Sequence, residues 1–449
     1  METGRHVGQL ARRLFTGVLI ETPSSDWPAA TSATAKAMAD GADCLFEAAF
    51  SNERIACRPD ILVREEEAWH LIEVKSGGAV NKSYLDDIAF QVAALLECGV
   101  RVMKASLIHI DKGYVGSAGQ IDHERFFKTV DVTEDVFHRL PNLQGELHEV
   151  VELIAGPEPQ VETNVHCLRP KCTFYDYCHE VAVEHDLVQL PRIKAERVVE
   201  FRRSGIASID QIPQDEKLTP TQRKIADVVR FDAPFVSDDL GAVLRNLPYP
   251  LHFVDFEALS VAIPPYAGVR PFQILPFQWS LHIVSKPGAE PVHKSFLADG
   301  SHDPRKEFTT SLWNAVQSAA TFVYYSNYEV SRLKELASHT VPNADLALEA
   351  FEKQGFDLLA VIKKHYYHPG FHGSFSIKSV LPAIVPDLSY DDLEIQGGDV
   401  AAYQFQRLIG DGLTAQSRAS IREALEEYCE RDTLAMVRLF DRLLEESAD

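Results

Sequence analysis

The sequence has 449 residues, of which 45% are hydrophobic and 24% charged, an ordinary composition for a globular protein. Its 66 acidic residues outnumber its 44 Lys and Arg residues, and the formal net charge of −22 argues against a protein that coats nucleic acid non-specifically. No apolar run approaches the roughly 18–20 residues of a membrane span, and the basic N-terminus lacks the apolar core of a signal peptide. We therefore expect a cytoplasmic protein that does not engage a membrane.

The length exceeds what one hydrophobic core usually supports, so we expect more than one domain. Changes in pattern divide the chain into four segments, residues 1–155, 156–185, 186–248 and 249–449. The first alternates predicted strands and helices, the second holds a cysteine cluster, and the third is a charged helical connector. The fourth has predicted strands near residues 251–259, 276–284 and 321–326, and a long helix over 415–446. The predicted fold class is therefore α/β.

Two β-rich runs in the first segment combine acidic residues with a lysine. Strand alternation puts Glu73 and Lys75 on one face of a predicted strand, and Asp60 lies on the strand before it. If these strands pair antiparallel, the two carboxylates come close enough to bind Mg²⁺ through oxygen. Lys75 would then polarise or deprotonate the attacking water. The alternative is an ordinary surface pair on an edge strand.

The pattern formed by Asp60, Glu73 and Lys75 resembles the PD-(D/E)xK motif of nucleases. Gln91, in the predicted helix that follows, resembles the glutamine of the QxxxY element in RecB-type nucleases, although Leu95 stands where the tyrosine would be. The resemblance implies a restriction-endonuclease-like fold for this segment. It also implies that the two acids bind metal and that Lys75 and Gln91 are catalytic.

Three of the seven cysteines crowd together at Cys167, Cys172 and Cys178. Without a secretion signal, thiolates this close are usually metal ligands rather than disulfide partners. Their position after a PD-(D/E)xK segment resembles the cysteine triplet of iron–sulfur RecB-like nucleases, which implies a 4Fe-4S cluster. Zinc and ligand-free reduced thiols are the alternatives. The fourth ligand is expected from Cys44, Cys57 or His166, or from a segment ahead of the first residue.

A second acidic pair lies in the run Leu251–Leu259, where Asp255 and Glu257 share one face of a predicted strand. Two like charges held side by side are costly unless a cation lies between them. The pair therefore predicts a metal site. The alternative is a pair of exposed residues on an edge strand.

Further acids follow in the same segment. Glu329 lies at a predicted strand-to-helix junction, and Tyr428 and Asp432 lie four residues apart, on one face of the long predicted helix. Ser376 and Lys378 lie between these motifs.

This order resembles the DnaQ-like DEDD exonuclease superfamily, whose fold is RNase H-like. Asp255 and Glu257 match its D-x-E motif, and Tyr428 with Asp432 matches the Y-x3-D motif of its tyrosine branch, whereas Glu329 replaces an aspartate. The resemblance implies that four acids hold two Mg²⁺ or Mn²⁺ ions and that Tyr428 positions the water. It also implies that Ser376 and Lys378 contact substrate phosphate.

The whole layout resembles a bacterial family that fuses a RecB-like module and its cysteine triplet to a DEDD-type domain. The resemblance implies a metal-dependent nuclease, an exonuclease on DNA or RNA, acting in repair or in defence against foreign nucleic acid. The alternative is a non-catalytic nucleic-acid- or partner-binding protein in which one or both nuclease folds have decayed. Leu95 and Glu329 favour decay, and the otherwise intact acids argue against it.

Overall fold

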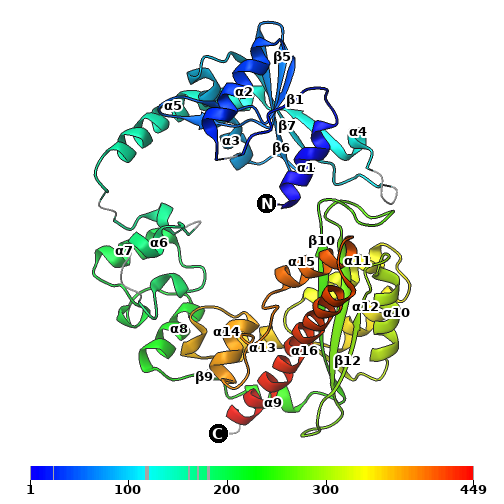
Figure 1. The fold of residues 1–449 in the computed structure, drawn as a ribbon. Helices are drawn as coiled ribbons and strands as arrows, with labels where there is room; N and C mark the ends of the chain where they lie inside the picture. The colour runs from blue at the N-terminus through cyan, green and yellow to red at the C-terminus, as the bar shows by residue number, and fades with distance from the viewer. Residues whose placement is uncertain are drawn as a thin grey trace. The chain divides into compact units, whose positions relative to one another are not determined.

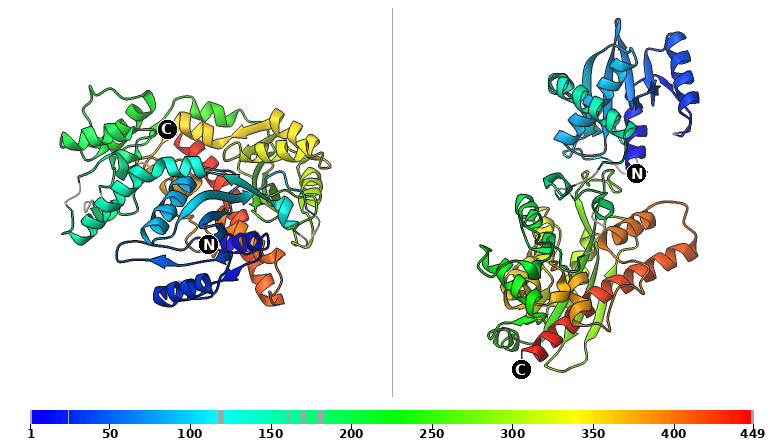
Figure 2. Two further views of the ribbon diagram at one scale, coloured as in Figure 1. Left: turned by 90° about the horizontal axis from the view of Figure 1, so that it is seen from above. Right: turned by 90° about the vertical axis from the view of Figure 1, so that its left-hand side faces the viewer.

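The computed structural model describes residues 2–23, 25–116, 121–159, 162–168, 171–178 and 183–447. The chain is of mixed α/β class and forms two compact units (Figures 1 and 2). The N-terminal unit comprises Met1–Gln160 and Ser260–Gln273, and the C-terminal unit comprises Val161–Leu259 and Ile274–Asp449. The pattern of the sequence had assigned residues 260–273 to the C-terminal segment. Among the described helices, none is both long and apolar enough to cross a bilayer.

The N-terminal unit is built on a six-stranded mixed sheet with the order β1-β2-β5-β6-β7-β8. Its strands are β1 (Val18–Leu19), β2 (Cys44–Phe46), β5 (Ile61–Glu65), β6 (Ala68–Lys75), β7 (Val102–Ile110) and β8 (Phe127–Asp131). A small hairpin joins β3 (Phe50–Ser51) to β4 (Ala56–Cys57). The helices are α1 (Glu2–Arg12), α2 (Trp27–Ala39), α3 (Lys82–Glu97), α4 (His123–Phe126) and α5 (Thr133–Ala155).

The two faces of this sheet are covered by different helices. Ile88 and Val92 of α3 pack in the same buried cluster as Leu71 of β6. Val7 of α1 packs in a second cluster with Ile72, the next residue along β6. Successive residues of a strand point to opposite faces, so Glu73 shares the face of Leu71 and lies toward α3.

The C-terminal unit begins with one short strand, β9 (Phe235–Val236), and a series of helical elements, namely η1 (Val165–Cys167), α6 (Tyr175–Cys178), η2 (Leu187–Gln189), α7 (Ala195–Arg203), η3 (Ile209–Gln211), α8 (Pro220–Phe231) and α9 (Leu240–Arg245). Its five-stranded sheet has the order β12 (Val292–Leu297), β11 (Ile274–Val284), β10 (Leu251–Ser260), β13 (Thr321–Tyr324) and β14 (Gly355–Asp357). The remaining elements are α10 (Arg305–Val316), α11 (Tyr328–Ser338), α12 (Ala344–Gln354), α13 (Leu358–His365), β15 (Tyr366–Tyr367), η4 (Pro369–Phe371), α14 (Ile377–Ile384), α15 (Gly398–Ile409) and α16 (Ala415–Glu446).

The sheet of the C-terminal unit lies between α10, α11 and α12 on one side and α16 on the other (Figure 1). Val254 and Phe256 of β10 pack into the cluster formed with α10 to α12. Phe253, on the opposite face, makes an edge-on contact with Phe440 of α16 at 5.7 Å between ring centroids. Asp255 shares the face of Phe253, so the strand presents it toward α16.

Buried polar contacts fix the position of α16 along the sheet. The Thr433 hydroxyl lies 2.8 Å from Ser280 Oγ and 2.8 Å from His282 Nδ1, both on β11. The Gln278 amide donates to the carbonyl of Leu425 at 2.8 Å. A shift of α16 by one turn would leave these buried groups without partners, which is costly. The contacts therefore set which helix residues face β10.

Phe440→Ala tests the packing of α16 on the sheet. Phe440 is 1% exposed, so we expect the substitution to lower the free energy of unfolding by about 3–5 kcal/mol. Leu346→Ala, at a position of α12 that is 46% exposed, is the control and should change stability by less than about 1 kcal/mol. Urea unfolding measures both, and equal losses would contradict this packing.

Candidate metal centre

Three carboxylates from distant parts of the sequence converge in the C-terminal unit. Asp255 and Glu257 extend from β10, and Asp432 extends from α16. One oxygen from each side chain lies within 4.8 Å of the other two. Among the described residues this is the one such group of three potential metal ligands. The strand that carries Asp255 and Glu257, β10, lies between β11 and β13 in the sheet. The interpretation of these two acids as exposed edge-strand residues is therefore wrong.

Glu329 lies beside this group. The turn before α11 contains Ser326 in the left-handed region (φ 97°), and it directs the chain into the helix at the end of β13. Glu329 is 2% exposed, and its Oε2 atom has no hydrogen-bond partner among the described residues. A buried carboxylate oxygen without a partner is rare, because burial without compensation is costly. Its charge interacts with Asp255 and Asp432.

The proximity of these acids shifts their ionisation. Burial raises the pKa of Asp255 well above its ordinary value, and the charges of Asp432 and Glu257 raise it further. Burial raises the pKa of Glu257 to about 8, with Asp432 adding to the effect. Burial raises the pKa of Asp432 to about 6, although a hydrogen bond from Tyr390 opposes the shift. A divalent cation would relieve all of these costs at once.

The donors suit a hard cation. All four acidic side chains offer carboxylate oxygens, the ligands that Mg²⁺ and Mn²⁺ prefer. A cation would bind carboxylate oxygens that lack other partners and lie close together. Glu329 Oε2 has no partner among the described residues, and Asp255, Glu257 and Asp432 lie close together. The residues therefore fit a divalent metal ion.

Further polar groups surround the acids. Tyr390 donates its hydroxyl to Asp432 Oδ1 at 2.6 Å, and Cys429 Sγ lies 3.6 Å from Asp255 Oδ2. Lys378 donates to the Tyr428 hydroxyl at 3.4 Å and also to the carbonyl of Gln396. Lys378 also lies against the rings of Tyr390 and Tyr428, 5.5 and 5.3 Å from their centroids. Its charge opposes the rise in the pKa of Asp432.

Sequence reasoning singled out Lys378 and Tyr428 but missed Tyr390 and Cys429. Cys429 follows Tyr428 directly on the helix and is fully buried, so its place beside a motif residue was the available signal. Tyr390 follows α14 in an irregular stretch, where no periodicity marks it.

Ser376, predicted to contact substrate, lies at the start of α14, two residues before Lys378. Its hydroxyl is bonded to Ser374 at 3.2 Å and to Ser379 at 3.0 Å. Both partners are side-chain hydroxyls, and the Ser376 side chain makes no capping bond to the backbone of α14. Asp357, by contrast, caps α13 by accepting from the backbone of Ala360 at 3.0 Å.

The N-terminal unit brings its predicted residues together in a different arrangement. β5 pairs antiparallel with β6, and Ile61 lies opposite Ile72. Asp60 directly precedes Ile61, so it lies at the end of this pairing. Asp60 Oδ2 accepts from the backbone of Val74 at 2.8 Å. Since β6 lies between β5 and β7, the interpretation of an exposed edge-strand pair is wrong here too.

Glu73 is the centre of a hydrogen-bonded network. It accepts from Lys75 at 2.8 Å on one oxygen and from Gln91 at 2.9 Å on the other. Lys75 also donates to Asp87 at 2.5 Å. Asp87 was missed from the sequence, although it precedes Gln91 by four residues and so shares its helix face.

The charges of this network keep Lys75 protonated in the metal-free protein. Burial lowers its pKa, but Glu73 and Asp87 outweigh that effect, and the pKa of Lys75 is raised overall. Burial raises the pKa of Glu73, and burial followed by the charge of Glu73 raises that of Asp60. Lys75 can therefore polarise a water molecule, whereas the prediction that it deprotonates one does not suit this state.

The three clustered cysteines all lie in the C-terminal unit and are partly buried. The backbone of Cys172 donates to the carbonyl of Cys167 at 3.0 Å, which closes the loop between them. Within the described part of the chain, their sulfurs do not form a group as tight as the acidic one. Cys44 and Cys57 lie in the cores of the N-terminal unit, where burial raises their pKa values to about 11 and about 12.

Part of the C-terminal unit matches a known family model. Residues 252–376 are similar to a domain of unknown function (DUF2779). The matched stretch includes Asp255, Glu257 and Glu329 and ends before Asp432. No curated protein matches the chain.

Glu257→Gln tests whether the burial and mutual repulsion of the acids destabilise the metal-free protein. The folded-state pKa of about 8 lies above the ordinary value of 4.5, so between these pH values the folded chain holds a proton that the unfolded chain has lost. Its stabilising contribution is complete below about pH 4.5 and is lost as the pH rises through about 8. In EDTA, the wild type should therefore lose more stability than Glu257→Gln between these pH values.

Thermal unfolding of both proteins measures this difference, with Glu423→Gln on an exposed position of α16 as the control. Glu423→Gln should behave like the wild type. A Glu257→Gln protein with the same pH dependence as the wild type would contradict this destabilisation.

Proposed function

We propose that this protein is a nuclease that hydrolyses phosphodiester bonds in DNA or RNA and requires Mg²⁺ or Mn²⁺. The observation that carries the proposal is the convergence of Asp255, Glu257 and Asp432 within 4.8 Å of one another, with Glu329 beside them. Four ionised carboxylates at one point carry more negative charge than one divalent cation neutralises. They suit a pair of cations on a substrate that carries negative charge.

Bound divalent ions would supply Lewis acidity toward a phosphate and a nucleophilic water at neutral pH. Asp255, Glu257, Glu329 and Asp432 would hold them. Tyr428 lies within the charge field of three of these acids, and its hydroxyl is kept as a neutral donor because burial and those acids raise its pKa. It can therefore orient a water molecule or a phosphate oxygen without carrying charge.

Lys378 brings a positively charged side chain to the acids. It reaches the Tyr428 hydroxyl at 3.4 Å, and its charge acts on Asp432, Glu257 and Asp255. An ammonium group in this place can bind a phosphate oxygen of the substrate. Ser376 would contribute only if its bonds to Ser374 and Ser379 were exchanged for substrate.

The arrangement of the sheet supports an RNase H-like fold for the C-terminal unit. The chain adds β11 and β12 on one side of β10 and then crosses to β13 and β14 on the other. β10 pairs parallel with β13, and β13 parallel with β14. Ligands of open α/β sheets favour the point where strand order reverses, and β10 carries Asp255 and Glu257 at that point.

The N-terminal unit would carry a second nuclease site of the PD-(D/E)xK kind, on a restriction-endonuclease-like fold. Asp60 and Glu73 would bind metal, Lys75 would polarise water, and Gln91 would hold Glu73 through its 2.9 Å hydrogen bond. This site is the weaker candidate for binding metal, because Lys75 and Gln91 already donate hydrogen bonds to both oxygens of Glu73.

The non-catalytic alternative is favoured by that same network. Ion pairs of Lys75 with Glu73 and Asp87 balance charge in the N-terminal unit without any metal. Among the residues that the structure describes, no lysine pairs within 4.0 Å with Asp255, Glu257, Glu329 or Asp432 as Lys75 does with Glu73. We therefore assign the chemistry to the C-terminal unit first, as an exonuclease in repair or in defence against foreign nucleic acid.

Degradation of end-labelled single-stranded DNA and RNA with Mn²⁺ tests the proposal. Asp255→Asn should lower the rate on the order of 100-fold, because it removes a metal ligand, and Lys75→Ala should leave most of it. Glu423→Gln is the matched exposed control and should keep full activity.

The double variant Asp255→Asn with Lys75→Ala checks for a contaminating enzyme. Activity that persists in it would defeat the assignment. A wild type without activity on either substrate would favour the binding alternative, and loss in Lys75→Ala alone would move the chemistry to the N-terminal unit.

The cysteine cluster has its own test. We propose that Cys167, Cys172 and Cys178 bind a 4Fe-4S cluster, with zinc as the alternative. Protein purified without oxygen should contain iron by elemental analysis, and Cys172→Ser should lose it while Cys98→Ser keeps it. Zinc instead of iron would select the alternative, and no metal at all would leave the thiols unligated.

A further inference from the structure

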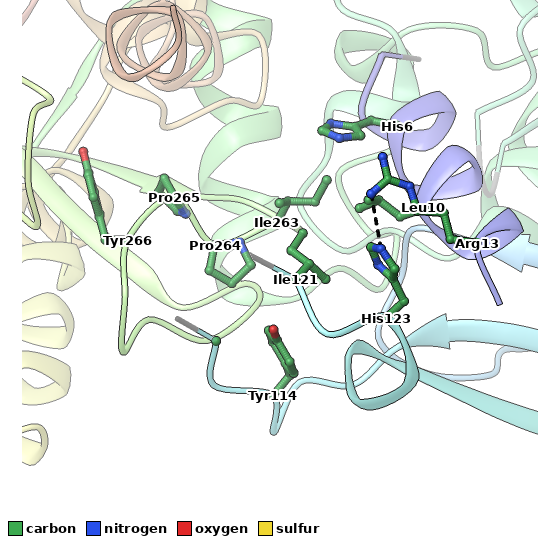
Figure 3. A pocket seen from close by; sticks show the side chains of 11 residues that line it. His6, Leu10, Arg13, Tyr114, Ile121, His123, Ile263, Pro264, Pro265 and Tyr266 are labelled. Atoms are coloured by element: carbon green, nitrogen blue, oxygen red, sulfur yellow. Dashed lines mark hydrogen bonds between the residues drawn. The ribbon is translucent and has the colours of Figure 1, made fainter. Parts of the chain in front are cut away.

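A separate cavity of about 550 Å³ lies within the N-terminal unit. Three parts of the chain line it, namely α1 with the residue that follows it, the stretch on either side of residues 117–120, and the segment Ser260–Gln273 (Figure 3). The segment joins this unit through a backbone hydrogen bond from Gly268 to Gly116 at 3.3 Å and through the buried side chain of Ala262. The volume is within the range of small-molecule sites.

One side of the cavity is cationic. His6, Leu10 and Arg13 are spaced four and three residues apart, so the turns of α1 present them on a common face. Arg13 lies 3.3 Å from His123 Nε2. A dashed line in Figure 3 marks this contact. Arginine side chains only donate hydrogen bonds, so His123 Nε2 is the acceptor in this contact.

The charge of Arg13 is therefore not cancelled. No carboxylate lies within 4.0 Å of it among the residues that the structure describes, although acids greatly outnumber basic residues in the chain. Among the described residues that line the cavity there is no Asp or Glu. Tyr114 accepts the backbone N–H of Asp122 at 3.1 Å, which leaves its own hydroxyl proton available to a ligand. These groups favour an anion with several acceptor oxygens.

The other side of the cavity is apolar. Ile263, Pro264 and Pro265 face the cationic side from the segment Ser260–Gln273, and Ile121 lies between (Figure 3). A simple anion would fill only a small part of the volume and would not use this wall. An anion joined to a flat apolar body would use both sides.

We propose that this cavity binds a nucleotide through its phosphate monoester and its base. The planar guanidinium of Arg13 matches two phosphate oxygens, with His6 and Tyr114 as further donors. The base would lie against Ile263 and Pro264. The same chemistry is offered by a free mononucleotide and by the 5′-phosphorylated end of an oligonucleotide. The inference does not rest on the proposed nuclease activity.

Calorimetric titration of the full chain with adenosine 5′-monophosphate tests the proposal. EDTA in the buffer prevents hydrolysis, so the result is independent of the metal centre. We expect saturable binding, with adenosine and inorganic phosphate each at least about tenfold weaker, since each lacks one half of the contacts. Phosphate alone binding as tightly as the nucleotide would overturn the proposal.

Variants locate the binding. Arg13→Gln should lower the affinity for the nucleotide at least about tenfold, and Ile263→Ser should lower this affinity as well. Arg5→Gln removes the same charge from an exposed position of α1 outside the cavity lining and should leave binding unchanged. An unchanged affinity in Arg13→Gln, or no binding to the wild type, would overturn the proposal.

Matched oligonucleotides with and without a 5′-phosphate distinguish the two sources. Tighter binding of the phosphorylated oligonucleotide than of the mononucleotide would identify a strand end as the ligand. Binding of the mononucleotide alone would identify a free nucleotide. Equal binding of the two oligonucleotides, at the strength of the mononucleotide, would contradict recognition of the phosphate.

Discussion

Carboxylates that are brought together inside a fold repel one another, and that repulsion is the constraint on which the C-terminal unit depends. Two full charges about 4.8 Å apart repel by about 3 kcal/mol at an effective dielectric constant of about 20. The cluster has three such pairs, with Glu329 as a fourth acid. Burial and this mutual repulsion raise the pKa values of Asp255 and Glu257, and burial raises that of Asp432, so the metal-free fold favours the protonated acids more than water does.

The elements that hold the acids are among the best-packed parts of the chain. β10 is an internal strand, with an aromatic cluster on one face and α16 on the other. α16 is fixed by Phe440 and by the polar contacts of Thr433. The site is therefore held by rigid elements, which is what precise placement of metal ligands requires. The N-terminal unit solves the same electrostatic problem differently, because a lysine neutralises its acids.

Local patterns in the sequence were enough to find the elements that carry the acids. The strand expected over residues 251–259 is β10 (Leu251–Ser260), and the helix expected over 415–446 is α16 with the same bounds. Period-two alternation placed Asp255 beside Glu257, and four-residue spacing placed Tyr428 beside Asp432. Both rules describe one element at a time, so they work without knowledge of the fold.

Contacts between distant elements could not be predicted in this way. Tyr390 reaches Asp432 from an irregular stretch, and Asp87 pairs with Lys75 from a neighbouring helix. The segment Ser260–Gln273 follows a C-terminal strand but packs with the N-terminal unit. Its apolar residues resemble those of any core, and no local rule states which core they join.

The most direct measurement of the central claim is anomalous scattering from crystals grown with Mn²⁺. If the three acids bind a divalent cation, manganese is bonded to oxygens of Asp255, Glu257 and Asp432 in the wild type and is lost in Asp432→Asn. Manganese absent from these side chains, or retained unchanged in that variant, would contradict the account.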